Sequence, residues 1–145
     1  SNRKSRKIGK RCSFVMSENF NLEIISPNKT LIKEEVKEVV IPAYEGLMTI
    51  LKDHISIVTF LRPGFIDVVL KDKTEKYYVE EGTVEFYKNN LLILSSTVKN
   101  KKDISREKAS EALKETRSLI ENKEIGDKEK YILSYKISTL EEINS

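Results

Sequence analysis

Through the first two thirds of the chain, hydrophobic and polar residues alternate with the two-residue period of a β-strand. Phe20, Leu22 and Ile24 alternate with Asn21 and Glu23 in the first such segment. Further apolar segments follow at short, regular intervals, at 31–41, 47–51, 55–61, 65–70, 75–80, 83–87 and 91–98. About eight to ten short strands with this spacing are typical of an antiparallel β-sandwich or a flattened barrel.

From Lys99 onward the apolar spacing changes to that of a helix, about 3.6 residues. We expect Asp103 to cap a first helix, Ile125-Gly126 to end it and Asp127 to cap a second. The apolar stripe of the first contains Ala109, Ala112, Leu113, Thr116, Leu119 and Ile120, and that of the second Ile132, Tyr135, Thr139, Leu140 and Ile143. Two such amphipathic helices joined by a short turn predict an antiparallel hairpin.

The predicted fold class is therefore α+β, an N-terminal antiparallel β-sandwich or flattened barrel followed by a C-terminal antiparallel two-helix hairpin. We divide the chain into a basic, disordered leader at 1–16, a β-sandwich domain at 17–99 and a helical hairpin domain at 100–145.

Composition excludes several classes of site and segment. The single Cys12 cannot form an internal disulfide or a cysteine-rich metal site, and the single His54 excludes a multi-histidine metal site within one chain. No apolar run approaches the roughly 18 residues of a membrane-spanning helix. No glycine-rich phosphate loop occurs, so we expect neither a metal nor a cofactor.

Charge is unevenly distributed along the chain. The net charge is +3, but the first sixteen residues carry +6 and no acid, which leaves −3 for the remainder. We interpret Met16 as the natural start, with an extension before it. A transit peptide and a disordered arm that touches phosphates are the other two interpretations of the leader.

The stretch 41–64 holds two of the three prolines, two of the five glycines and the only histidine. Tyr44, Leu47 and Met48 lie beside a predicted turn at Glu45-Gly46, where exposed apolar residues suggest a docking edge. Arg62-Pro63-Gly64 predicts a tight turn in which Gly64 takes a positive φ.

The histidine and the acidic residues offer little catalytic chemistry. Asp53 and His54 are adjacent, so their side chains should point apart, and no serine or cysteine nucleophile has a fitting context. We expect His54 to be structural or to contact a subunit. Glu34, Glu35 and Glu38 alternate with lysines and favour a solvated strand face over a metal cluster. An enzyme that uses His54 and Asp53 is therefore the weakest hypothesis for this sequence.

Several residues of this stretch resemble the signature loop of the epsilon subunit of F-type ATP synthase. They are Pro42, Glu45-Gly46, Ile50-Leu51, His54, Thr59 and Arg62-Pro63-Gly64. The opening strand 20–27 and the terminal hairpin resemble the family as well, so the resemblance covers 17–145. Thr49, Lys52-Asp53 and Ile55-Ser56 depart from the family pattern at positions that affect the loop backbone more than chemistry.

The resemblance implies a non-catalytic rotor subunit of the central stalk, which couples gamma to the c-ring during proton-driven ATP synthesis. It implies rotor contacts at Tyr44, Glu45, Leu47 and His54, and a place at the cytoplasmic face of the inner (plasma) membrane. The hairpin would inhibit ATP hydrolysis by bringing Arg106, Lys108, Lys114 and Arg117 toward the catalytic alpha and beta subunits. The homologous mitochondrial delta subunit fits the same motif.

The start of the first helix departs from the family's ATP-binding motif. That motif resembles (I/L)-D-x-x-R-A, whereas this chain has Ile104, Ser105, Lys108 and Ala109 at the corresponding positions. A serine replaces the acid, and Lys108 lacks the planar, bidentate guanidinium of arginine. These changes argue against regulatory ATP binding.

An alternative function is a free-standing β-sandwich adaptor whose basic arm binds nucleic acid or an anionic membrane surface. Deleting residues 1–15 would separate the two hypotheses, because only the adaptor should then lose its binding. The rotor hypothesis predicts no nucleic-acid partner.

Overall fold

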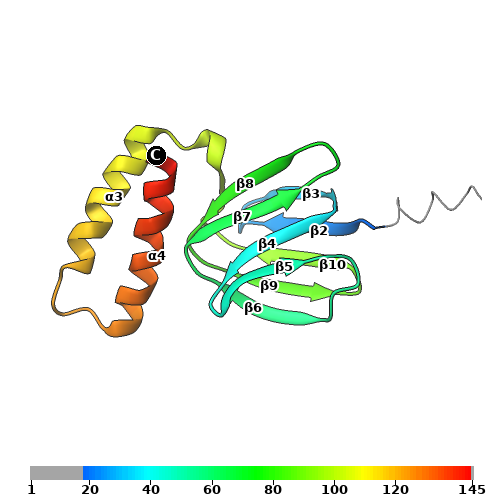
Figure 1. The fold of residues 1–145 in the computed structure, drawn as a ribbon, viewed down its shortest axis with the longest axis horizontal. Helices are drawn as coiled ribbons and strands as arrows, with labels where there is room; N and C mark the ends of the chain where they lie inside the picture. The colour runs from blue at the N-terminus through cyan, green and yellow to red at the C-terminus, as the bar shows by residue number, and fades with distance from the viewer. Residues whose placement is uncertain (1–17, 145) are drawn as a thin grey trace, which may run out of the picture.

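A computed structural model describes residues 18–144, which form a β-sandwich followed by two helices (Figure 1). The predicted α+β fold class is confirmed. The strands are β2 (Phe20–Ile25), β3 (Thr30–Val36), β4 (Glu38–Ala43), β5 (Gly46–Ile50), β6 (Ile57–Leu61), β7 (Gly64–Val69), β8 (Thr74–Val79), β9 (Gly82–Tyr87), β10 (Asn90–Leu94) and β11 (Lys99–Asn100). The leader predicted at 1–16 lies outside the described residues.

Hydrogen bonds connect the ten strands in the order β11-β8-β7-β4-β6-β9-β10-β2-β3, with β5 paired to β4. Every pair is antiparallel except β10 with β2, which is parallel. The alternation of polar and apolar residues could not reveal this pair, because it joins segments about 70 residues apart, such as Asn21 and Asn90.

The inward faces of the strands form one continuous core. Phe20 of β2 meets Phe86 of β9 edge to face, with ring centroids 5.6 Å apart, and both are at most 2% exposed. Burying an apolar side chain of this kind stabilises a fold by about 1.5–3 kcal/mol. The core also contains Leu22, Ile24, Ile32, Val36, Val39, Ile41, Ala43, Ile50, Leu61, Ile66, Val68, Tyr77, Val79, Val84, Leu91 and Ile93.

The segment expected to be one strand at 31–41 is two strands. The break falls at Lys37, whose backbone N–H donates to the carbonyl of Val69 at 2.9 Å. Pro42 does not end the second strand but is buried within β4. It fits there because pairing of β4 with β7 stops at Val40, so no ladder bond to β7 needs the missing N–H.

Gly64 is required for close packing and not for the predicted positive φ. Gly46 is the only described glycine with a positive φ, at 132°. A Cβ on Gly64 would lie 2.7 Å from the Cβ of Pro42, which is far inside contact distance. The two halves of the 41–64 stretch therefore pack directly against one another.

A short 3-10 turn, η1 (Lys101–Asp103), leads into α3 (Arg106–Ile120), and α4 (Asp127–Asn144) follows. The predicted caps are displaced. Ser105 caps α3, accepting a 3.1 Å hydrogen bond from the backbone of Lys108, while Asp103 belongs to η1. α3 ends at Ile120, five residues before Ile125, and Asp127 is the first residue of α4. Ser105, and not Asp103, is the N-cap because it directly precedes the first turn of α3.

The helical hairpin lies along one side of the sandwich, with α4 between α3 and the strands (Figure 1). Its small apolar contact, which we call the hairpin seat, contains Tyr78 of β8 with Ala109, Leu113, Leu140 and Ile143, and half-buried Phe65 and Ile104 at its margin. Leu119, expected on the buried stripe, is 47% exposed because it lies in the last turn of α3. Among residues 18–144, no helix is long and apolar enough to cross a membrane.

Candidate functional site

The turn between β4 and β5 presents apolar side chains at one end of the sandwich. We call Tyr44, Glu45 and Leu47 the docking edge; Leu47 is 71% exposed and Tyr44 39%. The hydroxyl of buried Thr59 donates to Oε1 of Glu45 at 3.1 Å, and the backbone N–H of Tyr44 donates to the carbonyl of Phe60 at 3.2 Å. The docking edge is thus fixed to β6, so its apolar side chains stand on a rigid support.

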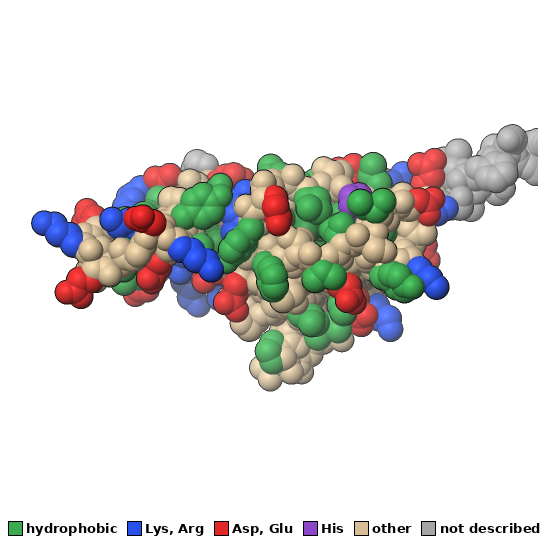
Figure 2. Space-filling model, turned by 90° about the horizontal axis from the view of Figure 1, so that it is seen from below, with side chains coloured by type: hydrophobic (Ala, Val, Ile, Leu, Met, Phe, Trp, Pro, Cys, Tyr) green, Lys and Arg blue, Asp and Glu red, His purple; other side chains and the backbone are tan. Residues whose placement is uncertain are grey.

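A second apolar surface extends from the docking edge along the outside of the sandwich. We call it the apolar face: Val58 and Phe60 of β6, Tyr87 of β9 and Leu94 of β10, which are 73, 59, 56 and 44% exposed. Strand register places all four on the same side of the sheet. Figure 2 shows hydrophobic side chains spread over this part of the molecule. Thr83 and Glu85 of β9 lie between these side chains, so the face is apolar with a polar strip across it. Exposed hydrophobic residues that gather on one side of a sheet mark interaction sites.

Sequence reasoning did not single out the apolar face. The signal was nevertheless present, because Ile57, Thr59 and Leu61 point inward and the two-residue period then places Val58 and Phe60 outside. An outward position that is hydrophobic on two or more neighbouring strands could have been found once the strand register was known.

His54 lies at the far end of β5 from the docking edge, so the structure does not bring the four predicted rotor contacts together. It is half-buried, with Nδ1 2.8 Å from the carbonyl oxygen of Ile55 and its ring edge-on to Phe86 at 6.0 Å. These contacts hold the imidazole against the core of the sandwich.

Asp53 is turned toward Asn89 instead of His54. Its backbone N–H donates to Oδ1 of Asn89 at 2.7 Å, and Nδ2 of Asn89 donates to its carboxylate at 3.0 Å. Both residues have positive φ, 66° and 61°, and the reciprocal bonds stabilise that backbone. These bonds engage the Asp53 carboxylate that a catalytic pair with His54 would need. Ile55, next to His54 in the chain, is 76% exposed.

The residues of the degenerate ATP motif serve the start of α3. Ser105 caps the helix, Ala109 is buried in the hairpin seat and Ile104 packs at its margin. Lys108 is exposed. The serine hydroxyl is already engaged by the backbone of Lys108, so the motif is explained by helix capping and packing.

Four basic residues of α3 were predicted to be regulatory, and all four are exposed. Arg117 is engaged within the hairpin, where its Nη2 lies 2.6 Å from Oε2 of Glu141 on α4. Arg106, Lys108 and Lys114 form no ion pair with any described residue. These three cations are thus exposed on α3 without an ion-pair partner among residues 18–144.

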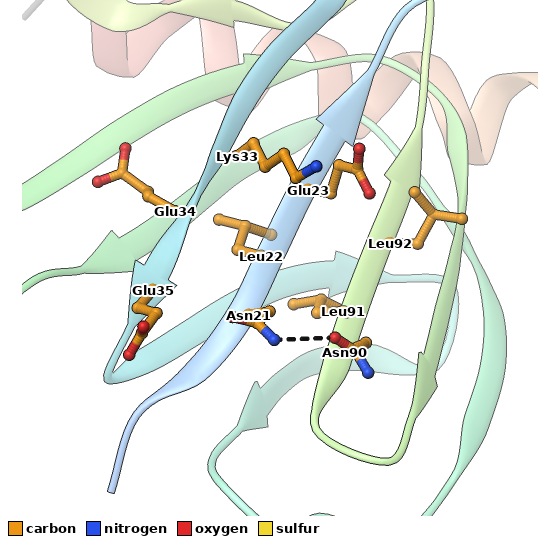
Figure 3. A pocket seen from close by; sticks show the side chains of 9 residues that line it. All are labelled: Asn21, Leu22, Glu23, Lys33, Glu34, Glu35, Asn90, Leu91 and Leu92. Atoms are coloured by element: carbon orange, nitrogen blue, oxygen red, sulfur yellow. Dashed lines mark hydrogen bonds between the residues drawn. The ribbon is translucent and has the colours of Figure 1, made fainter. Parts of the chain in front are cut away.

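A shallow hollow crosses β3, β2 and β10 on the outside of the sandwich (Figure 3). Nδ2 of Asn21 donates to Oδ1 of Asn90 at 3.0 Å, and Lys33 is opposite Glu23 in register. Glu34, Glu35 and Glu38 were predicted to form a solvated strand face; Glu34 and Glu35 are exposed and Glu38 is half-buried. No group of three or more residues that could hold a metal ion occurs within residues 18–144. The lining of the hollow mixes polar and charged side chains with Leu22, Leu91 and Leu92 and contains no serine, cysteine or histidine.

Comparison with known proteins matches the sandwich to a single family. The family model described as ATP synthase, Delta/Epsilon chain, beta-sandwich domain matches residues 19–101. The ATP synthase epsilon chain of Pelagibacter ubique (strain HTCC1062) is 48% identical over 130 residues, covering 89% of this chain and 100% of the relative.

The chain belongs to the ATP synthase epsilon family. The epsilon chain of Allorhizobium ampelinum is 38% identical over 93 residues, which cover 63% of this chain and 69% of the relative. The resemblance read from the 41–64 stretch is therefore confirmed.

Solved structures share the fold of this epsilon chain. One is from the Euglena gracilis mitochondrial ATP synthase (OSCP/F1/c-ring), with a TM-score of 0.73 at 21% identity, covering 98% of this chain and 97% of that one. Another is from the Tetrahymena thermophila mitochondrial ATP synthase central stalk and c-ring, with a TM-score of 0.58 at 12% identity, covering 86% and 96%. The Euglena match includes the helical hairpin, which lies largely outside the residues of the family model.

Proposed function

We propose that this epsilon chain joins the gamma subunit to the c-ring in the central stalk of an F-type ATP synthase and transmits rotation without catalysing a reaction. The observation that carries the proposal is the set of exposed apolar side chains that the docking edge and the apolar face present on neighbouring strands. The family membership supports it, and the Tetrahymena neighbour belongs to a central stalk and c-ring assembly.

A subunit that transmits torque needs a body that keeps its shape, and the sandwich has one. The bond between Glu45 and Thr59 fixes the docking edge, and the bonds between Asp53 and Asn89 fix the loop at the opposite end. Both hold turns that adjoin strands whose inward side chains fill a continuous core. Force applied at one surface would therefore reach the other without local unfolding.

We assign the two surfaces to different partners. The docking edge would meet the c-ring, and the apolar face with the loop of His54 and Ile55 would meet gamma. Leu47 of the docking edge and His54 lie at opposite ends of β5. Gamma would therefore contact the sandwich from beside the docking edge, at Phe60, to the far end of β5.

The hairpin would supply inhibition of ATP hydrolysis. Arg106, Lys108 and Lys114 are exposed and unpaired on α3, and extension of the hairpin would carry them toward acidic surface on the catalytic alpha and beta subunits. Such contacts between exposed charges weaken as salt increases. We further propose that the chain is peripheral at the cytoplasmic face of the inner membrane, held there by its partners.

The test is co-purification of the full chain with gamma from the same source. We expect a stoichiometric complex, and Val58→Asp should weaken it at least about tenfold, because a carboxylate would be buried at the centre of the contact. Glu35→Gln, an exposed change on edge strand β3, is the matched control and should bind normally. A folded chain that forms no complex with gamma would overturn the proposal.

The free-standing adaptor is not favoured. The family match covers the sandwich itself, and the basic arm on which the adaptor depends lies outside the described residues. Removal of residues 1–15 should leave gamma binding intact.

A further inference from the structure

Two polar contacts on consecutive residues of α4 attach the hairpin to the sandwich. The guanidinium of Arg62 lies over the ring of Tyr135, 3.8 Å from its centroid. Nζ of Lys136 lies 3.4 Å from Oε2 of Glu80. Arg62 precedes β7 and Glu80 follows β8, so the contacts reach α4 from the ends of two neighbouring strands.

The ion pair between Lys136 and Glu80 is oriented by the hairpin seat. The hydroxyl of Tyr78, which is buried there, donates to the same Oε2 of Glu80 at 2.7 Å. The side chains of Lys136 and Glu80 are 23% and 34% exposed, compared with 39% and 52% for the pair Lys76–Glu142 farther along α4. Partly desolvated pairs with a fixed geometry contribute more than exposed ones, so this pair matters most among those that join α4 to the strands.

Hydrogen bonds also hold Arg62 in place. Its backbone N–H donates to the carbonyl of Pro42 at 2.9 Å, and its Nη1 donates to the carbonyl of Pro63 at 3.0 Å. Nε is buried without a hydrogen-bond partner, so the guanidinium gives up solvation to lie on Tyr135. Stacking on an aromatic ring compensates an arginine for part of that loss.

Apart from these polar contacts, the interface between the hairpin and the sandwich is small. The apolar part of the seat has only Tyr78 and half-buried Phe65 on the sandwich side. The chain between the two regions holds two residues of β11, paired with Tyr77 and Tyr78, and then η1. A hairpin attached in this way can leave the sandwich without disturbing its core.

We propose that Arg62 and Glu80 of the sandwich and Tyr135 and Lys136 of α4 form a polar latch that determines whether the hairpin is docked. All four groups of the latch belong to the chain itself. Release would turn the hairpin about the segment 99–105 and would uncover Tyr78 and Phe65. The latch is a property of the isolated chain, and only its regulatory consequence rests on the proposed function.

Spin labels on two exposed positions, Glu35 of β3 and Ser110 of α3, would measure docking in a Cys12→Ser chain that is otherwise complete. We expect one dominant distance in the parent. Lys136→Glu should raise the population at other distances about tenfold, and the milder Lys136→Gln about threefold, as expected for a partly buried ion pair. In the double variant Glu80→Lys with Lys136→Glu, the population at other distances should return to within about twofold of that in the parent.

Arg117→Gln is the matched control, because it removes an ion pair within the hairpin and leaves the seat untouched. It should not change the distances. Helical circular dichroism and resistance to proteolysis would establish that each variant is folded. A folded Lys136→Glu chain with the distances of the parent, or a swap that fails to restore them, would overturn the latch.

In the assembled synthase, Lys136→Glu should lower ATP hydrolysis and the swap should restore it. If the distances respond but hydrolysis does not, the latch stands and the inhibitory role proposed for the hairpin fails. The two results are therefore distinguishable.

Discussion

The sandwich and the hairpin are stabilised in different ways. The interior of the sandwich is apolar and continuous, and Ile24, Ile66 and Ile93 are completely buried in it. The hairpin has a small seat and leaves Leu119 and Tyr131 about half exposed. The sandwich is therefore expected to fold on its own contacts, whereas the hairpin depends on the partner helix and on a few contacts with β7 and β8. This difference is what the proposed release of the hairpin requires.

The largest effect should come from emptying the core of the sandwich. Phe86→Ala removes a ring that is 1% exposed and packs against Phe20, and should lower the free energy of unfolding by about 3–5 kcal/mol. Denaturant titration with a β-sheet signal measures it. Tyr87→Ala, its exposed neighbour, is the control and should change stability little. Equal losses for the two variants would contradict the assignment of inner and outer faces.

A smaller loss of stability is expected where Gly64 packs against Pro42. Gly64→Ala places a Cβ 2.7 Å from that of Pro42 and should cost about 1–3 kcal/mol through overpacking. Gly126→Ala, between the two helices, meets nothing within 4 Å and should be neutral or slightly stabilising. Thermal unfolding of both variants compares the regions directly. A Gly64→Ala chain as stable as the parent would show that the contact is loose.

Alkaline pH should act on both regions through adjacent tyrosines. Burial, followed by hydrogen bonds to Glu75 and Glu80, raises the pKa of Tyr77 in the sandwich and of Tyr78 in the seat well above the usual value. The native state then keeps its protons at a pH where the unfolded chain, with a tyrosine pKa of about 10, loses them, so stability falls as pH rises above that value.

Each tyrosine should lower the free energy of unfolding by about 1 kcal/mol for each pH unit above about 10. Tyr78→Phe should therefore make docking of the hairpin less sensitive to alkali while the sandwich remains sensitive through Tyr77. Spin-label distances and the β-sheet signal, followed from pH 9 upward, report the two regions separately. An unchanged pH response of docking in Tyr78→Phe would contradict this account of the seat.

The sequence was informative where one residue type dictates local structure. Alternation located nearly every strand, and Gly46, in the turn predicted at Glu45-Gly46, has a positive φ. The resemblance at 41–64 identified the family. These features depend on neighbours in the chain, so they are visible without a structure.

Features that depend on distant contacts were missed. The requirement for Gly64 comes from Pro42 across the stretch, and the break at Lys37 comes from a bond to Val69. The latch joins Arg62 and Glu80 to residues more than 50 positions away, and no pattern within α4 predicts it. The role of Val58 on the apolar face likewise needed the register of neighbouring strands.

The most direct test of the central claim is native-state hydrogen exchange on the complete chain, comparing amides of β9 in the core with those of α4. We expect the α4 amides to open at least about 100-fold more often than the β9 amides, in a separate unit, because undocking the hairpin leaves the core intact. Exchange of both sets through one common opening, with equal protection, would contradict the account and would show that sandwich and hairpin form a single cooperative body.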